Sequence, residues 1–366
     1  MSQLQRPLDR DAILALPKVH LHDHLDGGLR PETIVELAPA AGVELPSDDP
    51  EELRTWFHRG ADRGSLPLYL EGFGVTCGVM QTEDNLRRVA REKAQDLAAD
   101  GIVYSEVRFA PVLHIHQGLN LEQVMNAVLA GLAEGCEGTS LETSVIVCSL
   151  RNMDTKLSLE AAELAVNYRD RGVVGFDLAG DESGHPPKAH LEAFQYLLRQ
   201  NFNITIHAGE AFGLSSIWQA IQFCGAHRIG HATRLDEDIN DAEGSESKGT
   251  LAQYILDQRI PLEMCLSSNV HTGAIDKVEN HPFPRYFREG FRVTLNVDNY
   301  LMSATTLTDE LLLAQELFGL TLDDMERLAV DGAKAAFLHF HERQQLIHAK
   351  ILPAFVVAKL EGQALR

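Results

Sequence analysis

The sequence predicts an α/β fold, a (β/α)8 TIM barrel with extra helices over its C-terminal mouth. Three observations carry this prediction. Eight short apolar segments, several rich in β-branched residues, recur along the chain. Segments with helical periodicity separate them, and polar residues follow several of the apolar segments directly. A barrel of this type typically needs about 250 residues, so a chain of 366 residues leaves room for insertions.

The eight predicted strands are short and buried in character. They cover residues 18–25, 102–109, 143–149, 173–178, 203–207, 228–230, 262–266 and 292–296. Pro31 suits the first turn of the helix that follows the first strand. Thr82 suits the N-cap of a later helix, which Asp100 and Gly101 would end before the second strand.

Two stretches can hold the additional residues. Residues 40–81 are rich in proline, glycine and aromatic side chains, and residues 234–249 are acidic and predict a solvated loop. The sequence contains no internal repeat and no linker. We therefore expect one domain over residues 1–366, with an insertion at about residues 40–81.

Composition excludes several classes of protein. Lys and Arg number 32 against 53 Asp and Glu, so the net charge is −21, which disfavours nucleic acid as a partner. The five cysteines form no Cys-x-x-Cys pair, which excludes a zinc ribbon and favours a reducing compartment. No apolar stretch is long enough for a membrane helix, and the first residues lack the apolar core of a secretory signal. We expect a cytoplasmic protein with no membrane partner.

The residues that carry chemistry lie where the predicted strands end. His22 and His24 end the first strand, and their two-residue spacing points both side chains to the same face. His207, His231 and Asp298 end or follow the fifth, sixth and eighth strands. Active sites of TIM barrels gather at this face. Three histidines and one aspartate there can bind a single zinc ion and leave a position open for water.

Two other pairs in the sequence share the His-x-His spacing. His114 and His116 begin a predicted loop, where histidines are more often at the surface. His339 and His341 fall in residues 333–350, which predict a helix, so their side chains would point to different sides. Neither pair is accompanied by polar residues at other strand ends, and we assign neither pair to a metal.

Seven short motifs in this chain resemble those of the adenosine deaminase family, within the metal-dependent amidohydrolase superfamily. They are residues 17–27 (PKVHLHDHLDG), 106–111 (EVRFAP), 177–182 (DLAGDE), 207–210 (HAGE), 228–231 (RIGH), 267–269 (SSN) and 296–298 (NVD). They occur in family order. The resemblance implies hydrolytic deamination of adenosine and 2′-deoxyadenosine to inosine products and ammonia, a purine salvage reaction.

The resemblance also implies roles for individual residues around the metal. His22, His24, His207 and Asp298 would hold one Zn²⁺ per chain. His231 would orient the attacking water and take or stabilise its proton. Glu210 would protonate N1 of the purine, which requires a carboxyl group whose pKa is raised by burial or by nearby negative charge. Asp181 and Glu182 are candidates for that charge.

The remaining implied roles concern the nucleoside. Gly180 would offer its backbone N–H to purine N3, Asp26 would bind the ribose 5′-hydroxyl, Asn299 would face N7, and His24 would border the substrate. Residues 66–73 resemble the family's lid segment. Within it four apolar residues fall on one helical face and would cover the substrate: Leu66, Tyr69, Leu70 and Phe73.

Two positions depart from the family pattern. Asn299 stands where the family usually has a second aspartate, and its amide N–H₂ can donate to N7 without being protonated. Asp23 stands between His22 and His24, where an apolar residue is common. Because Asp23 points away from the metal face, we expect an Arg or Lys partner among the surrounding helices.

Other activities remain open at this stage. An adenine deaminase would act on the free base, but its motif generally has Glu where this chain has Asp26. A deaminase of another 6-aminopurine nucleoside or of a nucleotide such as AMP is a further alternative. A nucleotide would need cationic partners for its phosphate, for which Arg30, Arg59 and Arg63 are candidates. A catalytically inactive relative would have lost Glu210 or a metal ligand, and this chain retains them.

Overall fold

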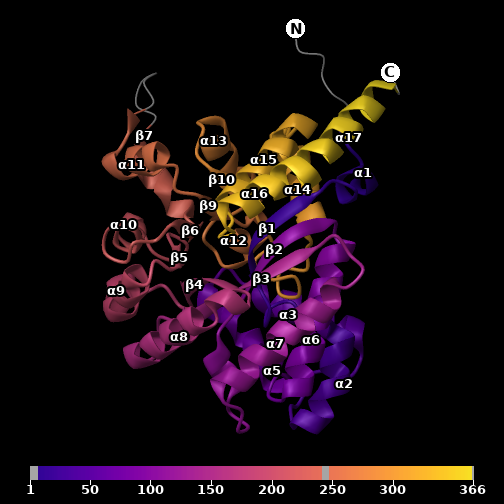
Figure 1. Cartoon of the computed structure of the whole chain (residues 1–366), viewed down its shortest axis with the longest axis vertical. Helices are drawn as coiled ribbons and strands as arrows, with labels where there is room; N and C mark the ends of the chain where they lie inside the picture. Colours follow the sequence, from indigo (N-terminus) through magenta and orange to yellow (C-terminus); the bar gives the residue numbers. More distant parts are fainter. Residues whose placement is uncertain (1–6, 241–246, 365–366) are drawn as a thin grey trace.

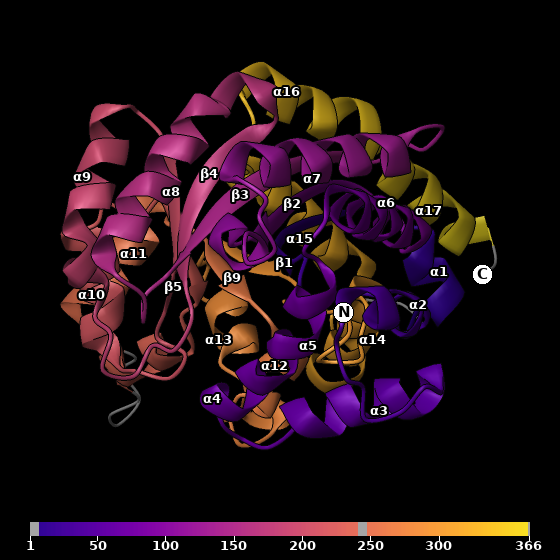
Figure 2. The same ribbon diagram turned by 90° about the horizontal axis from the view of Figure 1, so that it is seen from below.

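The computed structural model describes residues 7–240 and 247–364. Its centre is a sheet of eight parallel strands that curves into a barrel, in the order β1-β2-β3-β4-β5-β6-β9-β10 (Figures 1 and 2). The strands are β1 (Lys18–His24), β2 (Ile102–Phe109), β3 (Glu142–Leu150), β4 (Val173–Ala179), β5 (Asn203–Ala208), β6 (Arg228–His231), β9 (Leu262–Met264) and β10 (Val293–Leu295). All eight predicted strands are present, and the predicted fold class is confirmed.

The barrel closes between its first strand and the segment that follows its last strand. The backbone N–H of His24 donates to the carbonyl of Asp298 at 2.8 Å, and the N–H of Asp298 donates to the carbonyl of His22 at 3.0 Å. The N–H of Val297 donates to Nε2 of His20 at 3.0 Å. His20 therefore ties the seam together; its Nδ1 lies 3.7 Å from Oδ2 of Asp23, and its ring packs against Tyr300.

Helices surround the strands and cover one end of the barrel (Figure 2). The α-helices are α1 (Arg10–Leu14), α2 (Pro31–Ala41), α3 (Pro50–Ala61), α4 (Leu66–Tyr69), α5 (Phe73–Val79), α6 (Glu83–Ala99), α7 (Leu121–Cys136), α8 (Thr155–Asn167), α9 (Leu191–Arg199), α10 (Leu214–Gln222), α11 (Thr250–Gln258), α12 (Leu266–His271), α13 (Phe283–Arg288), α14 (Leu307–Phe318), α15 (Leu322–Ala335), α16 (Phe340–Gln345) and α17 (Leu352–Ala364). Both views place α17 close to α1.

Short 3-10 and π-helical turns join these elements. They are η1 (Leu70–Gly72), η2 (Pro111–His114), η3 (Arg169–Arg171), η4 (Pro187–His190), η5 (Thr233–Asp238), η6 (Val278–Asn280) and the π-helix η7 (Leu346–Ile351). The predicted helix signals hold where the sequence placed them. Pro31 begins α2, the Thr82 side chain accepts from the N–H of Asn85 at the start of α6, and Gly101 has φ +72° after its end.

The two predicted insertions differ in character. Residues 40–81 contain α3, α4, η1 and α5 between the first and second strands of the barrel. In the second insertion, the predicted acidic loop is more structured than expected, because η5 is followed by a small antiparallel pair, β7 (Ile239–Asn240) and β8 (Ser247–Lys248). Residues 241–246 of that prediction lie outside the described residues.

Two expectations about histidines were wrong. The predicted helix over residues 333–350 is interrupted, because α15 ends at Ala335 and α16 begins at Phe340. His339 therefore precedes a helix instead of lying inside one. His114 is fully buried, with Nδ1 3.2 Å from the carbonyl of Met80, and is not a surface residue. Among the helices of residues 7–240 and 247–364, none has both the length and the apolar character needed to cross a membrane.

Candidate active site

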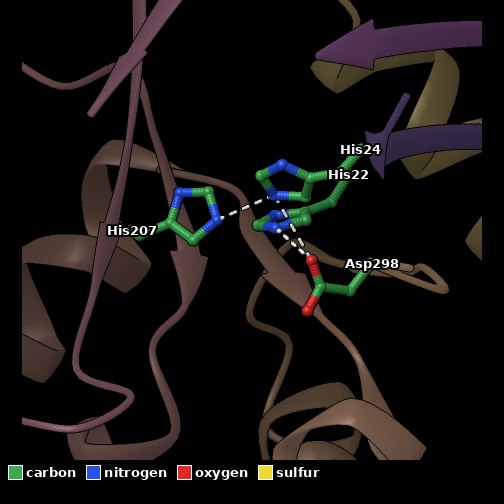
Figure 3. A group of neighbouring side chains, drawn as sticks. All are labelled: His22, His24, His207 and Asp298. Atoms are coloured by element: carbon green, nitrogen blue, oxygen red, sulfur yellow. Dashed lines mark hydrogen bonds and ion pairs between the residues drawn. The ribbon is translucent and has the colours of Figure 1, made fainter. Parts of the chain in front are cut away.

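Four side chains from three parts of the barrel meet at one point (Figure 3). His22 and His24 come from β1, His207 from β5, and Asp298 from the segment after β10. Nε2 of His24 lies 3.2 Å from Nε2 of His207. Oδ1 of Asp298 lies 3.3 Å from Nε2 of His22 and 3.4 Å from Nε2 of His24. The fold thus gathers three nitrogens and one oxygen from positions up to 276 residues apart, the separation of His22 and Asp298 in the sequence (298 − 22).

The donor set fits a divalent cation. Nε2 of His22 is buried and makes no hydrogen bond with any described residue. The outer nitrogens of two of the histidines are held by carboxylates: Nδ1 of His22 lies 2.8 Å from Glu263 and Nδ1 of His207 lies 3.0 Å from Asp177. The Ser268 hydroxyl donates to Oδ2 of Asp298 at 2.6 Å. Carboxylates that hold the far nitrogen of a histidine are typical of metal sites, because they fix the ring and make the near nitrogen a better ligand.

Two buried arginines support those carboxylates from below. Arg108 donates to Asp177 at 3.0 Å and to Glu263 at 2.8 Å, and Arg228 donates to Glu263 at 2.6 Å. Burial alone would raise the pKa of Glu263, but the two guanidinium groups hold it well below its usual value. Both carboxylates therefore stay charged beneath the histidines, where they can offset the charge of a cation.

Beside the four side chains is a cavity of about 220 Å³. Its lining residues are His24, Asp26, Leu66, Tyr69, Leu70, Phe73, Ala110, Leu113, Cys148, Leu150, Asn152, Ala179, Gly180, His207, Glu210, His231, Asp298 and Asn299. This set contains the substrate, acid–base and lid residues expected from the sequence. It contains no arginine or lysine. The cavity is therefore apolar along one side and polar at the end that faces the histidines.

The carboxyl group of Glu210 is poised to be protonated near neutral pH. Burial raises its pKa to about 8, the charge of Asp298 adds to the effect, and Glu182 contributes less than Asp298. The Thr272 hydroxyl donates to Oε1 of Glu210 at 2.9 Å and opposes the shift. That hydrogen bond fixes one oxygen of the group and leaves Oε2 toward His231, whose Nε2 is 3.5 Å away.

Glu182 has a second and larger role than the sequence suggested. Its carboxylate accepts the backbone N–H groups of four consecutive residues, Gly209 at 2.7 Å, Glu210 at 2.9 Å, Ala211 at 2.7 Å and Phe212 at 3.0 Å. The side chain is 3% exposed. A buried charge that accepts four N–H groups fixes the path of the loop that carries Glu210.

A chain of hydrogen bonds sets the protonation of His231. The N–H of Phe283 donates to Nδ1 of His281, so Nε2 of His281 donates to the carbonyl oxygen of Asn269 at 3.1 Å. The amide nitrogen of Asn269 then donates to Nδ1 of His231 at 3.0 Å. Burial lowers the pKa of His231 well below its ordinary value, so the ring is neutral. Its one proton is therefore on Nε2, the nitrogen nearer Glu210.

Backbone strain is concentrated at the same place. His231 has φ +67°, Ala232 has φ +52° and Asp298 has φ +72°. Residues with a side chain rarely adopt this left-handed conformation, which costs about 1–3 kcal/mol per residue. Such strain persists where the surrounding structure over-determines it, often at functional sites. Here it occurs at the last residue of β6 and the residue after it, and three residues after the end of β10, where His231 and Asp298 line the cavity.

The expected substrate residues are also part of the cavity lining. Asp26 and Gly180 line the cavity, and Gly180 has φ +92°, which favours glycine. Asn299 is 2% exposed, and its Oδ1 has no hydrogen-bond partner among the described residues. A Cβ atom on Gly27 would lie 1.7 Å from that oxygen, so only glycine at position 27 leaves room for the Asn299 side chain.

The cationic partner expected for Asp23 is Lys93. Its Nζ lies 2.5 Å from Oδ1 of Asp23, and both side chains are buried. Lys93 comes from α6, so the interaction joins β1 to a helix of the outer layer. Its ammonium group also lies 3.9 Å from the centre of the Tyr300 ring. The prediction that Asp23 pairs with a Lys or Arg outside the barrel is confirmed.

Several contacts of the site were not predicted from the sequence, although residues 267–269 were noted as a family motif. Ser268, Asn269 and Thr272 contact Asp298, His231 and Glu210, and all three lie in α12 or directly after it. Asp177 and Glu263 were missed as partners of histidines. A signal was present for the last two, because each is a carboxylate inside an otherwise apolar strand, where an isolated charge would be costly.

Comparison with known proteins agrees with this geometry. The family model described as adenosine deaminase matches residues 17–351. The chain belongs to the adenosine deaminase family. It is 51% identical over 358 residues to an adenosine deaminase of Mycolicibacterium vanbaalenii, which covers 96% of this chain and 98% of that protein. It is 52% identical to adenosine deaminase 1 of Streptomyces coelicolor, over 96% of this chain and 90% of that protein.

Solved structures show the same fold at lower identity. An adenine deaminase from Arthrobacter aurescens superposes with a TM-score of 0.82 at 26% identity, over 94% of this chain and 99% of that one. The N6-methyl-AMP deaminase from Arabidopsis thaliana superposes with a TM-score of 0.80 at 27% identity, over 96% and 100%. The fold is thus shared by proteins named for a free base and for a nucleotide. The fold alone therefore does not define the substrate, which depends on the residues that line the cavity.

Proposed function

We propose that this chain is a zinc-dependent adenosine deaminase, which hydrolyses adenosine and 2′-deoxyadenosine to inosine products and ammonia. One observation carries the proposal: a small cavity places a buried carboxyl group and a neutral imidazole beside three histidines and an aspartate. The names of relatives about half identical to this chain support the same reaction.

The residues divide the work between the two reacting atoms of the purine. A zinc ion held by His22, His24, His207 and Asp298 would lower the pKa of a bound water from about 16 toward about 7. Glu210, protonated because of its raised pKa, donates to N1 and withdraws electron density from the ring. C6 then accepts the water oxygen. His231 presents its Nε2–H beside Glu210, where it can hold that oxygen by donating a hydrogen bond.

Asp298 acts twice in this scheme. One oxygen faces the histidines as a ligand, and its negative charge raises the pKa of the Glu210 carboxyl group. That group therefore keeps its proton until the substrate is in place. The proton that the water gives up would return to Glu210, and the proton of the hydroxyl group then on C6 would pass to the amino group. The C6–N bond would then break, ammonia would leave, and inosine would keep a carbonyl at C6 and a proton on N1.

The cavity lining favours an uncharged nucleoside. No arginine or lysine is among its lining residues. The three arginines considered as phosphate partners are engaged elsewhere or line other surfaces: Arg30 pairs with Asp96, Arg63 pairs with Glu71, and Arg59 borders a groove on α3. Asp26 lies within the cavity, at the position proposed for the ribose 5′-hydroxyl, and has no use with a free base.

The lid and the environment complete the proposal. Leu66, Tyr69, Leu70 and Phe73 line the cavity although their segment is α4, η1 and α5 instead of one continuous helix. We propose that they close over the nucleoside and exclude bulk water. All five cysteines are free, which supports work in a reducing compartment such as the cytoplasm.

A purine panel tests the function. Zinc-loaded protein is mixed with adenosine, 2′-deoxyadenosine, adenine, AMP and N6-methyl-AMP, and the change in purine absorbance is followed with metal content measured on the same sample. We expect kcat/KM for the two nucleosides to exceed that for the other purines by at least about 10², because Asp26 would meet no ribose in adenine and a negative phosphate in the nucleotides. Faster turnover of adenine or a nucleotide would overturn the assignment.

A further inference from the structure

A second group of metal-binding side chains lies outside the catalytic cavity. His58 on α3, Asp62 directly after α3, and His271 at the end of α12 each offer one ligand atom, and these atoms lie within 4.8 Å of one another. The His58 and His271 ring centres are 5.1 Å apart. In the catalytic group the His24 and His207 ring centres are 5.3 Å apart. The second pair of rings thus has the spacing of the first.

The hydrogen bonds of the two rings favour metal binding. Nδ1 of His58 lies 3.4 Å from the carbonyl of Met302, and a carbonyl can only accept, so this nitrogen carries the proton. With the proton on Nδ1, the nitrogen of His58 that can bind a metal ion is Nε2. Nδ1 of His271 is buried and has no hydrogen-bond partner among the described residues. An imidazole whose far N–H is held by a carbonyl is a common arrangement for a metal ligand.

We propose that His58, Asp62 and His271 form a second site for a zinc-class divalent cation. Two imidazole nitrogens and one carboxylate oxygen are ligands that zinc prefers, and water would complete the coordination. Asp62 is exposed, so an ion can enter from solvent without displacing packed side chains.

The second metal-binding group lies between the start of the lid and the end of α12. The N–H of Gly64 already donates to the carbonyl of His271 at 2.9 Å, so the end of α3 and the end of α12 are in contact. The lid residues begin two positions after Gly64, at Leu66. A cation at the second site would therefore link the segment that leads into the lid to His271. Thr272, the next residue, donates a hydrogen bond to Glu210.

Metal stoichiometry tests the site independently of the deaminase reaction. Protein carrying one equivalent of zinc is dialysed against increasing free Zn²⁺, and bound metal is measured for wild type, His58→Gln, Asp62→Asn and His271→Gln. Gln at position 58 can still donate to Met302, and Asp62 is exposed, so both variants keep the fold. A double variant of two exposed histidines, His341→Gln with His348→Gln, is the control. We expect a second saturable equivalent in wild type and control, and its loss in the three variants.

Hydrogen exchange tests whether the cation links the start of the lid to the end of α12. If opening of residues 62–73 breaks the second site, exchange through that opening slows by 1 + [Zn]/Kd, about tenfold at ten times Kd. We expect this slowing in wild type and not in His58→Gln or Asp62→Asn. The site is refuted if wild type binds no second equivalent or if the variants bind it unchanged. Fastening of the lid is refuted if bound zinc leaves exchange of residues 62–73 unaltered.

Discussion

Replacing Glu182 by Gln is the sharpest test of how this site holds its general acid. The change removes a buried charge and one of two acceptor oxygens while keeping the size of the side chain. In the wild type, Oε2 accepts the N–H groups of Glu210, Ala211 and Phe212, and Oε1 accepts that of Gly209. An amide can place its oxygen opposite three of these groups, but its NH₂ must then face the fourth.

The expected magnitude follows from that count. A hydrogen bond to a charged group contributes about 1.5–3 kcal/mol, and the fourth N–H loses its acceptor altogether. If the weaker hydrogen bonding displaces Glu210 from its position in the transition state, the activation free energy rises. A rise of about 1.4–2.8 kcal/mol lowers kcat by about 10- to 100-fold. We expect KM to change much less, because Glu182 does not line the cavity.

A pH profile separates this positioning role from a general loss of stability. Glu182 is among the charges that raise the pKa of Glu210, so its neutralisation lowers that pKa. The alkaline limb of kcat/KM should therefore move to lower pH in Glu182→Gln. The matched control is Asp181→Asn, which removes the neighbouring negative charge. The Asp181 carboxylate accepts the N–H of Ser183 and none of the four N–H groups that Glu182 accepts. Wild-type kcat and an unmoved alkaline limb in Glu182→Gln would refute the reasoning.

Four further outcomes are expected. Glu210→Gln should retain metal and nucleoside binding in calorimetry but lose kcat by about 10² to 10⁴, since Gln cannot donate a proton to N1; normal turnover would contradict this. Wild-type kcat/KM should fall as pH rises through about 8, because the Glu210 carboxyl must be protonated and burial raises its pKa to that value; a rate profile that is flat to pH 10 would argue against it. In metal-free protein, the folded state holds the Glu210 proton up to about pH 8 while the unfolded chain releases it near 4.5, so the free energy of unfolding should fall with rising pH over that interval; urea unfolding of Glu210→Gln should lack this fall. Asp26→Ala should raise KM for adenosine by about tenfold or more with unchanged metal content, and an unchanged KM would count against the ribose contact.

The barrel was predictable because its signals are local. Eight apolar strands, a proline at the start of α2 and a threonine cap on α6 each act over a few residues. The meeting of the histidines could also be predicted, because alternation along β1 places His22 and His24 on one face and parallel strands end at the same mouth. The identity of the Asp23 partner was not accessible, since Lys93 is brought to it only by the packing of α6 against the barrel.

What escaped prediction depends on long-range packing. Asn269 and Thr272 are ordinary polar residues of a short helix, and nothing in their spacing shows that they reach His231 and Glu210. Glu182 was interpreted as a source of charge, because its four backbone contacts depend on the fold of a loop that begins 27 residues later, at Gly209. His114 was interpreted as exposed because it begins a loop in the sequence. In the fold it is buried against a distant segment, where its Nδ1 lies near the carbonyl of Met80, 34 residues earlier.

The seam of the barrel places a constraint on the order of events during synthesis. His22 and His24 lie on β1, and Asp298 lies in the segment after β10 that closes the seam, so the four side chains cannot come together until most of the chain has been made. A nascent chain that ends before residue 298 can pair its barrel strands in sequence order from β1 to β10, but it lacks Asp298 and cannot assemble the four ligands. A cation that binds only the closed barrel stabilises that form. Metal binding would therefore stabilise the barrel only after its seam has closed, at the last step of folding. Truncated or stalled chains would be left with their first strand unpaired on one side, which is a surface that chaperones and proteases can recognise.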